Sequence, residues 1–335
     1  MNLLPLFVAA AIAALASDVA APVTPDTFPR AETDLHFSSV VKDAGLGKFA
    51  HQRMPAAVDK QRAAHIDRDT LSSTAVFDLD AGPVTITLPD AGKRFLSMQL
   101  IDEDGYTPEV VYGPGSHTLA KDGIGTRYVM AVIRIFVAAD DPKDVDQVKA
   151  LQDAVKVDQP TGPGAFRTPN WDAAQQAEVR TGLAVLALTL PDTKGMFGRR
   201  GEVDPVRRLI GSATAWGGIP GKDALFLSVT PDRNDGKTVY RVDVKDVPVD
   251  GFWSISVYNE RGFFEPNPQH AYTVNSVTAK TAPDGSIAVQ FGGCGGTTAN
   301  CLPAPPGWSY LVRLYQPRAA ILNGAWAFPE PKPEP

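Results

Sequence analysis

The chain has 335 residues, of which 44% are hydrophobic and 21% are charged, a composition typical of globular proteins. Its length favours two domains, because a single hydrophobic core seldom extends beyond about 250–300 residues. The formal net charge is −6 and no basic run is present, which argues against a nucleic-acid partner.

An apolar run over residues 3–16 opens the chain and ends in small residues, Ala14 and Ala16 followed by Ser17. This pattern is typical of a signal peptide, so residues 1–17 are predicted to be removed on export to the periplasm or the exterior. The alternative is an uncleaved anchor, although the run is shorter than the ~20 residues that span a bilayer. Residues 18–35 are predicted to form a linker, and no later segment resembles a membrane span.

From His65 the hydrophobic pattern changes to a period of two. Alternating or β-branched runs separated by Gly- and Pro-containing turns predict strands over 74–79, 84–88, 94–101 and 127–137. Closely spaced short strands favour an antiparallel sandwich or barrel. We expect an N-terminal β-sandwich domain over 36–160.

Three helices follow, and then the strand pattern returns. Acids, Pro142 and helical apolar spacing predict a helix over 143–155, and similar signals predict helices over 171–188 and 205–216. The last two belong to a helical connector over 161–220. Strands are predicted over 224–229, 240–244, 252–258, 286–291 and 310–315, which gives a second β-sandwich domain over 221–328 and a flexible Pro-rich tail over 329–335.

The segment 252–258 is the most informative strand of the second half. Alternation places Trp253, Ile255 and Val257 on one face, and Ser254, Ser256 and Tyr258 on the other. The first set indicates a core face and the second a mixed, more polar face.

Cys294 and Cys301 are the only two cysteines and lie in a glycine-rich segment. In an exported protein, two cysteines this close predict one disulfide. The alternative, a metal site, lacks further thiols or nearby histidines, and the nearest metal-like pair elsewhere is His65 with Asp67, which is weak. No phosphate-binding loop or nucleophile elbow is present, so we expect no cofactor and no metal.

Two arginines stand in otherwise apolar strands. Arg134 shares a face with Tyr128, Met130, Val132 and Phe136, and Arg313 shares a face with Ser309, Leu311 and Tyr315. A charge so placed needs a partner or an open cleft, because burying it unpaired is expensive. The two interpretations are a ligand-binding arginine and a structural salt bridge to an aspartate such as Asp69 or Asp102.

Short motifs in order resemble a known pair of domains. The segment HIDRDTLSS over 65–73, with Gly82-Pro83-Val84 and Leu88-Pro89-Asp90, resembles the domain of unknown function numbered 1254. The segments AWGGIP over 215–220, FWSI over 252–255, GFFEPNP over 262–268 and RLYQP over 313–317 resemble the domain of unknown function numbered 1214. The resemblance implies a mainly β (α+β) fold of two jelly-roll-like antiparallel β-sandwich domains joined by a helical segment, and it implies no reaction.

Three hypotheses of function remain. The first is a small organic or glycan-like ligand bound in an interdomain cleft, with candidate residues Arg68, Asp69, Arg134, Tyr258, Arg313 and Tyr315. The second is a cofactor-independent, hydrolase-type enzyme in which Asp69 is the candidate catalytic base, with Arg134 or Arg313 holding an anion. The third is a structural protein that self-associates into a homo-oligomer.

Overall fold

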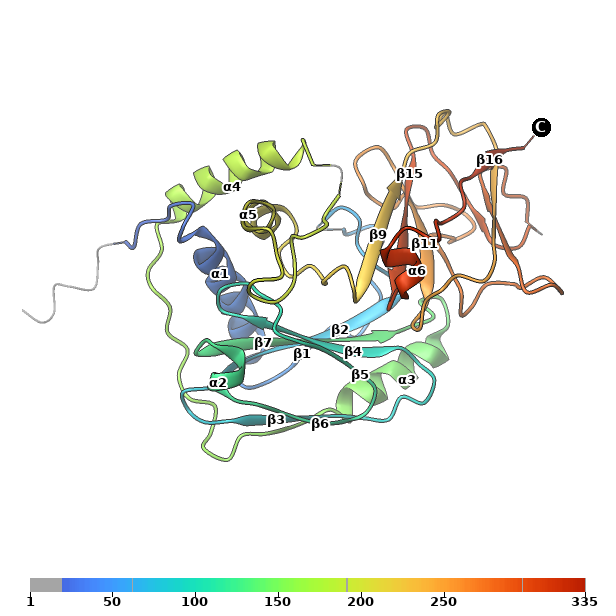
Figure 1. Ribbon diagram of the computed structural model, residues 1–335. Helices are drawn as coiled ribbons and strands as arrows, with labels where there is room; N and C mark the ends of the chain where they lie inside the picture. Colours follow the sequence, from blue (N-terminus) through green and yellow to red (C-terminus); the bar gives the residue numbers. More distant parts are fainter. Residues whose placement is uncertain (1–19, 62, 191, 297, 335) are drawn as a thin grey trace, which may run out of the picture.

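The computed structural model describes residues 20–61, 63–190, 192–296 and 298–334. Two β-sandwiches lie side by side, and three helices cover part of the first (Figure 1). The expected fold class, mainly β with two sandwiches and a helical segment between them in the chain, is thereby confirmed. The expected signal peptide, residues 1–17, lies outside the described residues.

The N-terminal sandwich consists of a five-stranded and a three-stranded sheet. The larger sheet has the order β1-β2-β7-β4-β5, formed by Ala50–His51, Thr70–Asp78, Tyr128–Phe136, Leu96–Asp102 and Val110–Tyr112. The smaller has the order β6-β3-β8, formed by Gly115–Leu119, Val84–Leu88 and Lys156–Asp158. All pairs in both sheets are antiparallel. Helices α2 (Lys121–Ile124) and α3 (Pro142–Asp153) complete this domain.

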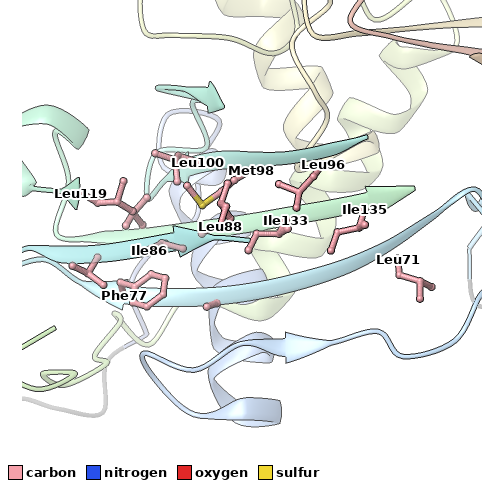
Figure 2. Packing of buried hydrophobic residues seen from close by; sticks show 14 of the residues in the cluster. Leu71, Phe77, Ile86, Leu88, Leu96, Met98, Leu100, Leu119, Ile133 and Ile135 are labelled. Atoms are coloured by element: carbon pink, nitrogen blue, oxygen red, sulfur yellow. The ribbon is translucent and has the colours of Figure 1, made fainter. Parts of the chain in front are cut away.

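The first core follows from strand alternation, since one face of each sheet carries the aliphatic side chains (Figure 2). Phe77 from β2, Met98 from β4 and Ile133 from β7 are fully buried between the two sheets. Helix α3 adds Val148 to the same cluster, and its start is stabilised by Asp141, whose carboxylate accepts a hydrogen bond from the Lys143 amide. Each such buried side chain contributes about 1.5–3 kcal/mol to stability.

The C-terminal sandwich consists of two four-stranded sheets. One has the order β14-β13-β10-β16, formed by Cys301–Leu302, Ile287–Phe291, Tyr240–Val244 and Lys332–Pro333. The other has the order β12-β11-β15-β9, formed by Thr273–Asn275, Trp253–Tyr258, Ser309–Tyr315 and Ala224–Val229. The short helix α6 (Ala319–Leu322) follows β15. Trp253, Ile255 and Val257 lie in this core, so the predicted alternation of the strand is confirmed.

Helices α1 (Phe28–Ala44), α4 (Ala173–Ala187) and α5 (Pro205–Thr214) pack together, and α1 also lies against β2 (Figure 1). The prediction of a linker over 18–35 is therefore wrong from Phe28 onward, where α1 begins. Its polar residues are buried with the apolar ones: Glu32 accepts from Gln176 and Arg180, and Asp34 accepts from the Trp171 indole. Because polar and apolar residues of α1 are both buried, its sequence lacks the apolar stripe that marks an amphipathic helix.

The prediction of a flexible tail over 329–335 is also wrong for the described part. Lys332 and Pro333 form β16 and pair with Arg241 and Tyr240 of β10. The Glu334 amide then donates to the Val239 carbonyl at 2.8 Å. Proline at a sheet edge is tolerated because its missing N–H faces away from the ladder.

The predicted disulfide is present, since Cys294 and Cys301 are bonded with their Cα atoms 5.6 Å apart. It connects the loop after β13 to β14, which runs parallel to β13 at the edge of its sheet.

Candidate functional site

The two domains meet through the outer faces of two sheets. The N-terminal domain supplies the part of the outer face of its five-stranded sheet that α1 does not cover. The C-terminal domain supplies the face of β11 and β15 that points away from its own core. Aromatic contacts cross this junction: Phe136 packs on Phe252 with ring centroids 4.9 Å apart, and Phe95 lies 5.1 Å from Tyr315. The polar candidates lie around this aromatic contact.

Asp69 is 1% exposed and bonds across the interface. Its two carboxylate oxygens accept from the Thr273 hydroxyl at 2.8 Å and from the Asn275 amide at 2.9 Å, both on β12. Burial, reinforced by the neighbouring Asp67 carboxylate, raises the pKa of Asp69 to about 6. Each oxygen thus accepts a hydrogen bond from the other domain, and the carboxylate is closed off from solvent.

Arg313 is 3% exposed and reaches from β15 into the N-terminal domain. Its guanidinium donates to the His65 carbonyl at 2.8 Å, the Tyr258 hydroxyl at 2.7 Å and the Ser256 hydroxyl at 2.9 Å. Tyr258 in turn donates to the Ile66 carbonyl at 2.8 Å. Arg313 and Tyr258 therefore join the domains through hydrogen bonds, and neither Asp69 nor Asp102 is a salt-bridge partner of Arg313 among the described residues.

Tyr315 and Arg68 are likewise engaged. The Tyr315 hydroxyl donates to the Asp67 carboxylate at 3.0 Å, and burial followed by that charge raises the pKa of Tyr315 well above its usual value. Arg68 donates to the Ala56 carbonyl, lies 3.5 Å from the Asp140 carboxylate and stands over the Tyr272 ring at 5.3 Å. Both residues serve the junction between the domains.

Arg134 differs from the other candidates. It is half-buried near the end of β7, between Ser72 and Ser97 of the neighbouring strands. Within the described residues its single hydrogen bond runs from Nη1 to the Gln99 amide oxygen at 2.9 Å. Burial lowers the pKa of Arg134, opposed by Tyr315 and Asp67, and the predicted alternative of a salt bridge to Asp69 or Asp102 is absent from the described contacts. A guanidinium has five N–H donors, so most of those on Arg134 have no protein acceptor.

Two residues beside Arg134 were not predicted from the sequence. The Tyr112 hydroxyl donates to Asp223 at 3.0 Å, and burial, followed by the Asp223 charge, raises the pKa of Tyr112 while Arg134 lowers it. The second oxygen of Asp223 is buried without a protein partner in the described part of the chain, and burial raises the pKa of this carboxyl group. Asp223 is the last residue of the turn that precedes β9, and no local sequence pattern marks it as a site residue.

The candidates thus form one interdomain cluster, defined here as Arg68, Asp69, Arg134, Tyr258, Arg313 and Tyr315. Of this cluster, Tyr258 also lines a cavity of about 170 Å³ in the C-terminal domain, together with Tyr272 and Glu265, and Arg134 is not part of that lining. Over residues 20–61, 63–190, 192–296 and 298–334, no group of three or more His, Cys, Asp or Glu side chains is arranged to hold a metal ion. None of the described helices is long and apolar enough to cross a membrane.

Comparisons with known proteins identify the domains and leave the chemistry open. The VPA0106 protein from Vibrio parahaemolyticus shares the fold with a TM-score of 0.70 and 17% identity, over 93% of this chain and 98% of that one. An uncharacterised protein from Burkholderia cenocepacia gives a TM-score of 0.50 and 12% identity, over 92% of this chain and 87% of that one. No curated protein matches the sequence.

Two family models match the sequence itself. Residues 46–123 match "Protein of unknown function (DUF1254)", and residues 228–319 match "Protein of unknown function (DUF1214)". The sequence therefore carries a match to DUF1254 followed by a match to DUF1214, the order that its motifs predict.

Proposed function

We propose that this chain is an exported binding protein, and that it holds a small organic acid or an acidic sugar at the interdomain cluster, with Arg134 as the anchor. The observation that carries the proposal is the hydrogen bonding of Arg134, whose one described partner is a neutral amide oxygen at 2.9 Å. A guanidinium in a half-buried position with most of its donors unused is suited to a carboxylate, which accepts two parallel hydrogen bonds.

The surroundings of Arg134 support a ligand that combines charge with an apolar or sugar-like body. Burial raises the pKa of the Tyr112 and Tyr315 hydroxyls, and the Arg134 charge is close enough to oppose that rise in both. Phe95 packs on both tyrosine rings, with centroids 6.1 and 5.1 Å away. Aromatic walls with a few convergent polar groups are typical of small-molecule sites.

Binding is favoured over hydrolysis by the state of Asp69. Its two oxygens accept from Thr273 and Asn275, and it is buried, so it resembles a structural carboxylate more than a general base. The Cys294–Cys301 disulfide supports export, because disulfides persist in oxidising compartments.

A thermal-shift screen tests the proposal. Glucuronate, galacturonate, citrate and benzoate are compared with the uncharged glucose, galactose and benzamide on the mature protein. A specific ligand at 100 times its Kd stabilises the folded state by about 2.7 kcal/mol, which raises Tm by several degrees. We expect at least one anion, and not its neutral counterpart, to give this shift.

Arg134→Gln is the decisive variant, and it should abolish the shift. Arg94→Gln is the matched control, because Arg94 is an arginine of the same domain whose guanidinium donates to Asp144, Gln147 and the Phe136 carbonyl. Arg94→Gln is expected to lower the melting temperature and to retain the ligand shift. A shift that survives Arg134→Gln, or equal shifts for charged and neutral compounds, would refute the anchor.

A further inference from the structure

The C-terminal sandwich contains a second cavity, of about 610 Å³. It lies on the opposite face of β15 from the interdomain cluster, because Tyr310 and Val312 line it while Arg313 and Tyr315 point to the other domain. Its walls are mainly aliphatic and proline side chains, with Leu227 and Val229 from β9. The volume falls in the range of about 300–1,000 Å³ that is common for small-molecule sites.

The Tyr310 hydroxyl is the unusual polar atom of this cavity. Tyr310 is 1% exposed, its ring stacks on Phe291 with centroids 4.8 Å apart, and its hydroxyl has no hydrogen-bond partner among the described residues. Burial raises the pKa of this hydroxyl, and the Glu330 carboxylate in the cavity wall raises it further. Tyr310 and Glu330 both line the cavity. A buried hydroxyl without a partner costs about 1–3 kcal/mol, so the site favours a group that supplies one.

The C-terminal segment 328–333 forms one wall of the cavity. Phe328, Pro329, Pro331 and Pro333 line it, and β16 ties the segment to β10. Prolines have no backbone N–H, so this wall presents rings and few donors. Polar groups are also present in the lining, on Thr230, Asp232, Arg233, Tyr240 and Glu330.

From these contacts we propose that the cavity is a second binding site, for a mainly apolar small molecule with one hydrogen-bonding group that meets the Tyr310 hydroxyl. The apolar body is stabilised by removal from water against β9, β15 and the proline wall. The single polar group satisfies Tyr310, which acts as both donor and acceptor. This site is independent of the Arg134 anchor and takes an uncharged ligand.

A pair of probes that differ by one hydroxyl tests the proposal. Binding of 2-naphthol and naphthalene to the full-length mature protein is measured by ligand-observed NMR and by isothermal titration. We expect 2-naphthol to bind more tightly than naphthalene. Tyr310→Phe keeps the ring and removes the hydroxyl, so it should weaken 2-naphthol binding about three- to tenfold and leave naphthalene binding unchanged.

Two further variants locate the site. Val229→Phe fills the cavity and should abolish binding of both probes, whereas Tyr272→Phe, a matched change at the other cavity of this domain, should alter neither. Arg134→Gln should also leave both affinities unchanged. The proposal is overturned if 2-naphthol does not bind up to its solubility limit, or if Tyr310→Phe weakens both probes equally or neither. Circular dichroism of Tyr310→Phe verifies that the domain is folded.

Discussion

Several buried carboxyl groups in this protein have a raised pKa, so they stay protonated up to a higher pH than exposed carboxyl groups do. Burial raises the pKa of Asp34 to about 6, an effect that its hydrogen bond from the Trp171 indole at 2.8 Å opposes. Asp69 and Asp102 are also raised to about 6, with burial as the largest cause. Near pH 5 the folded state therefore holds protons that the unfolded chain has already released.

The contribution of these groups to stability should consequently fall as the pH rises from about 4 to about 6, opposite in sign to that of carboxyl groups whose pKa is lowered, such as Asp78 and Asp144. The sign follows from linkage: a folded pKa above the unfolded value of 3.8 gives stability that is complete below pH 4 and is lost through pH 6. For Asp34, which is 2% exposed, the loss is on the order of 3 kcal/mol. Asp34→Asn keeps an acceptor for Trp171 and removes the charge, so it should gain stability over the natural chain at pH 7.5 and not at pH 4.

Urea denaturation at the two pH values measures this difference. The control is Asp122→Asn, which changes an exposed carboxylate on α2 and should give the same difference from the natural chain at both pH values. If the gain of Asp34→Asn is equal at pH 4 and pH 7.5, the carboxyl group does not titrate in this range.

Among the helices and strands, the bounds were predicted best for strands that turn only one face toward a core. The ranges 84–88, 224–229 and 240–244 coincide with β3, β9 and β10, because their alternating apolar residues all point between two sheets. Helix α1 was missed because buried ion pairs replace part of its apolar face, and β16 was missed because a Pro-rich edge strand lacks any strand pattern. Both depend on partners that are distant in the sequence, on Arg180 and Trp171 for α1 and on Tyr240 and Arg241 for β16.

The turn over 259–262 shows a different limit of the sequence. Its Asn and Gly predict a turn, and the structure adds that the Gly262 carbonyl accepts from the His65 amide of the other domain at 2.7 Å. Gly262 has a φ of +78°, and a Cβ there would lie 2.9 Å from the His65 ring. The glycine is therefore required twice, for backbone conformation and for close domain contact, and the sequence indicates only the first.

The disulfide contributes to stability at the element scale. Replacing Cys294 and Cys301 together by serine should lower the free energy of unfolding by about 2 kcal/mol, because the short loop is no longer closed in the unfolded chain. Chemical denaturation with and without dithiothreitol measures it. The reductant should lower the stability of the natural chain to that of the double variant and leave the variant unchanged. Equal stability of the two oxidised proteins would contradict this expectation.

At the scale of the whole molecule, the sequence identified the polar residues of the interface but not their pairing. Alternation predicted which face of its strand carries Arg134 and which carries Arg313, and the two faces do meet. The partners of Arg313 are carbonyl and hydroxyl oxygens, one of them 248 positions away, and such neutral acceptors leave no mark in a sequence. Pairing residues by opposite charge therefore suggested Asp69 or Asp102 as a partner, and among the described residues neither arginine forms a salt bridge to them.

The last prediction follows from the position of Arg313 between the domains. Arg313→Gln removes charge-assisted hydrogen bonds to the His65 carbonyl and the Tyr258 hydroxyl and leaves these buried groups without their donor. Such bonds are worth about 1.5–3 kcal/mol each, so the loss should be at least about 3 kcal/mol. Because the bond to His65 crosses the interface and Tyr258 itself bonds across it to Ile66, calorimetry should show one unfolding transition for the natural chain and two for the variant, as the domains uncouple.

Arg241→Gln provides the comparison within the same domain. Arg241 is an exposed arginine of β10 that pairs with Asp243 on its own strand, and its loss should cost about 0.5 kcal/mol or less. A single transition for Arg313→Gln, with a loss no larger than that of Arg241→Gln, would mean that Phe136, Phe252 and Tyr315 hold the domains together without it. Two transitions would instead assign the coupling of the domains to the polar part of the interface, beside the position proposed for the ligand.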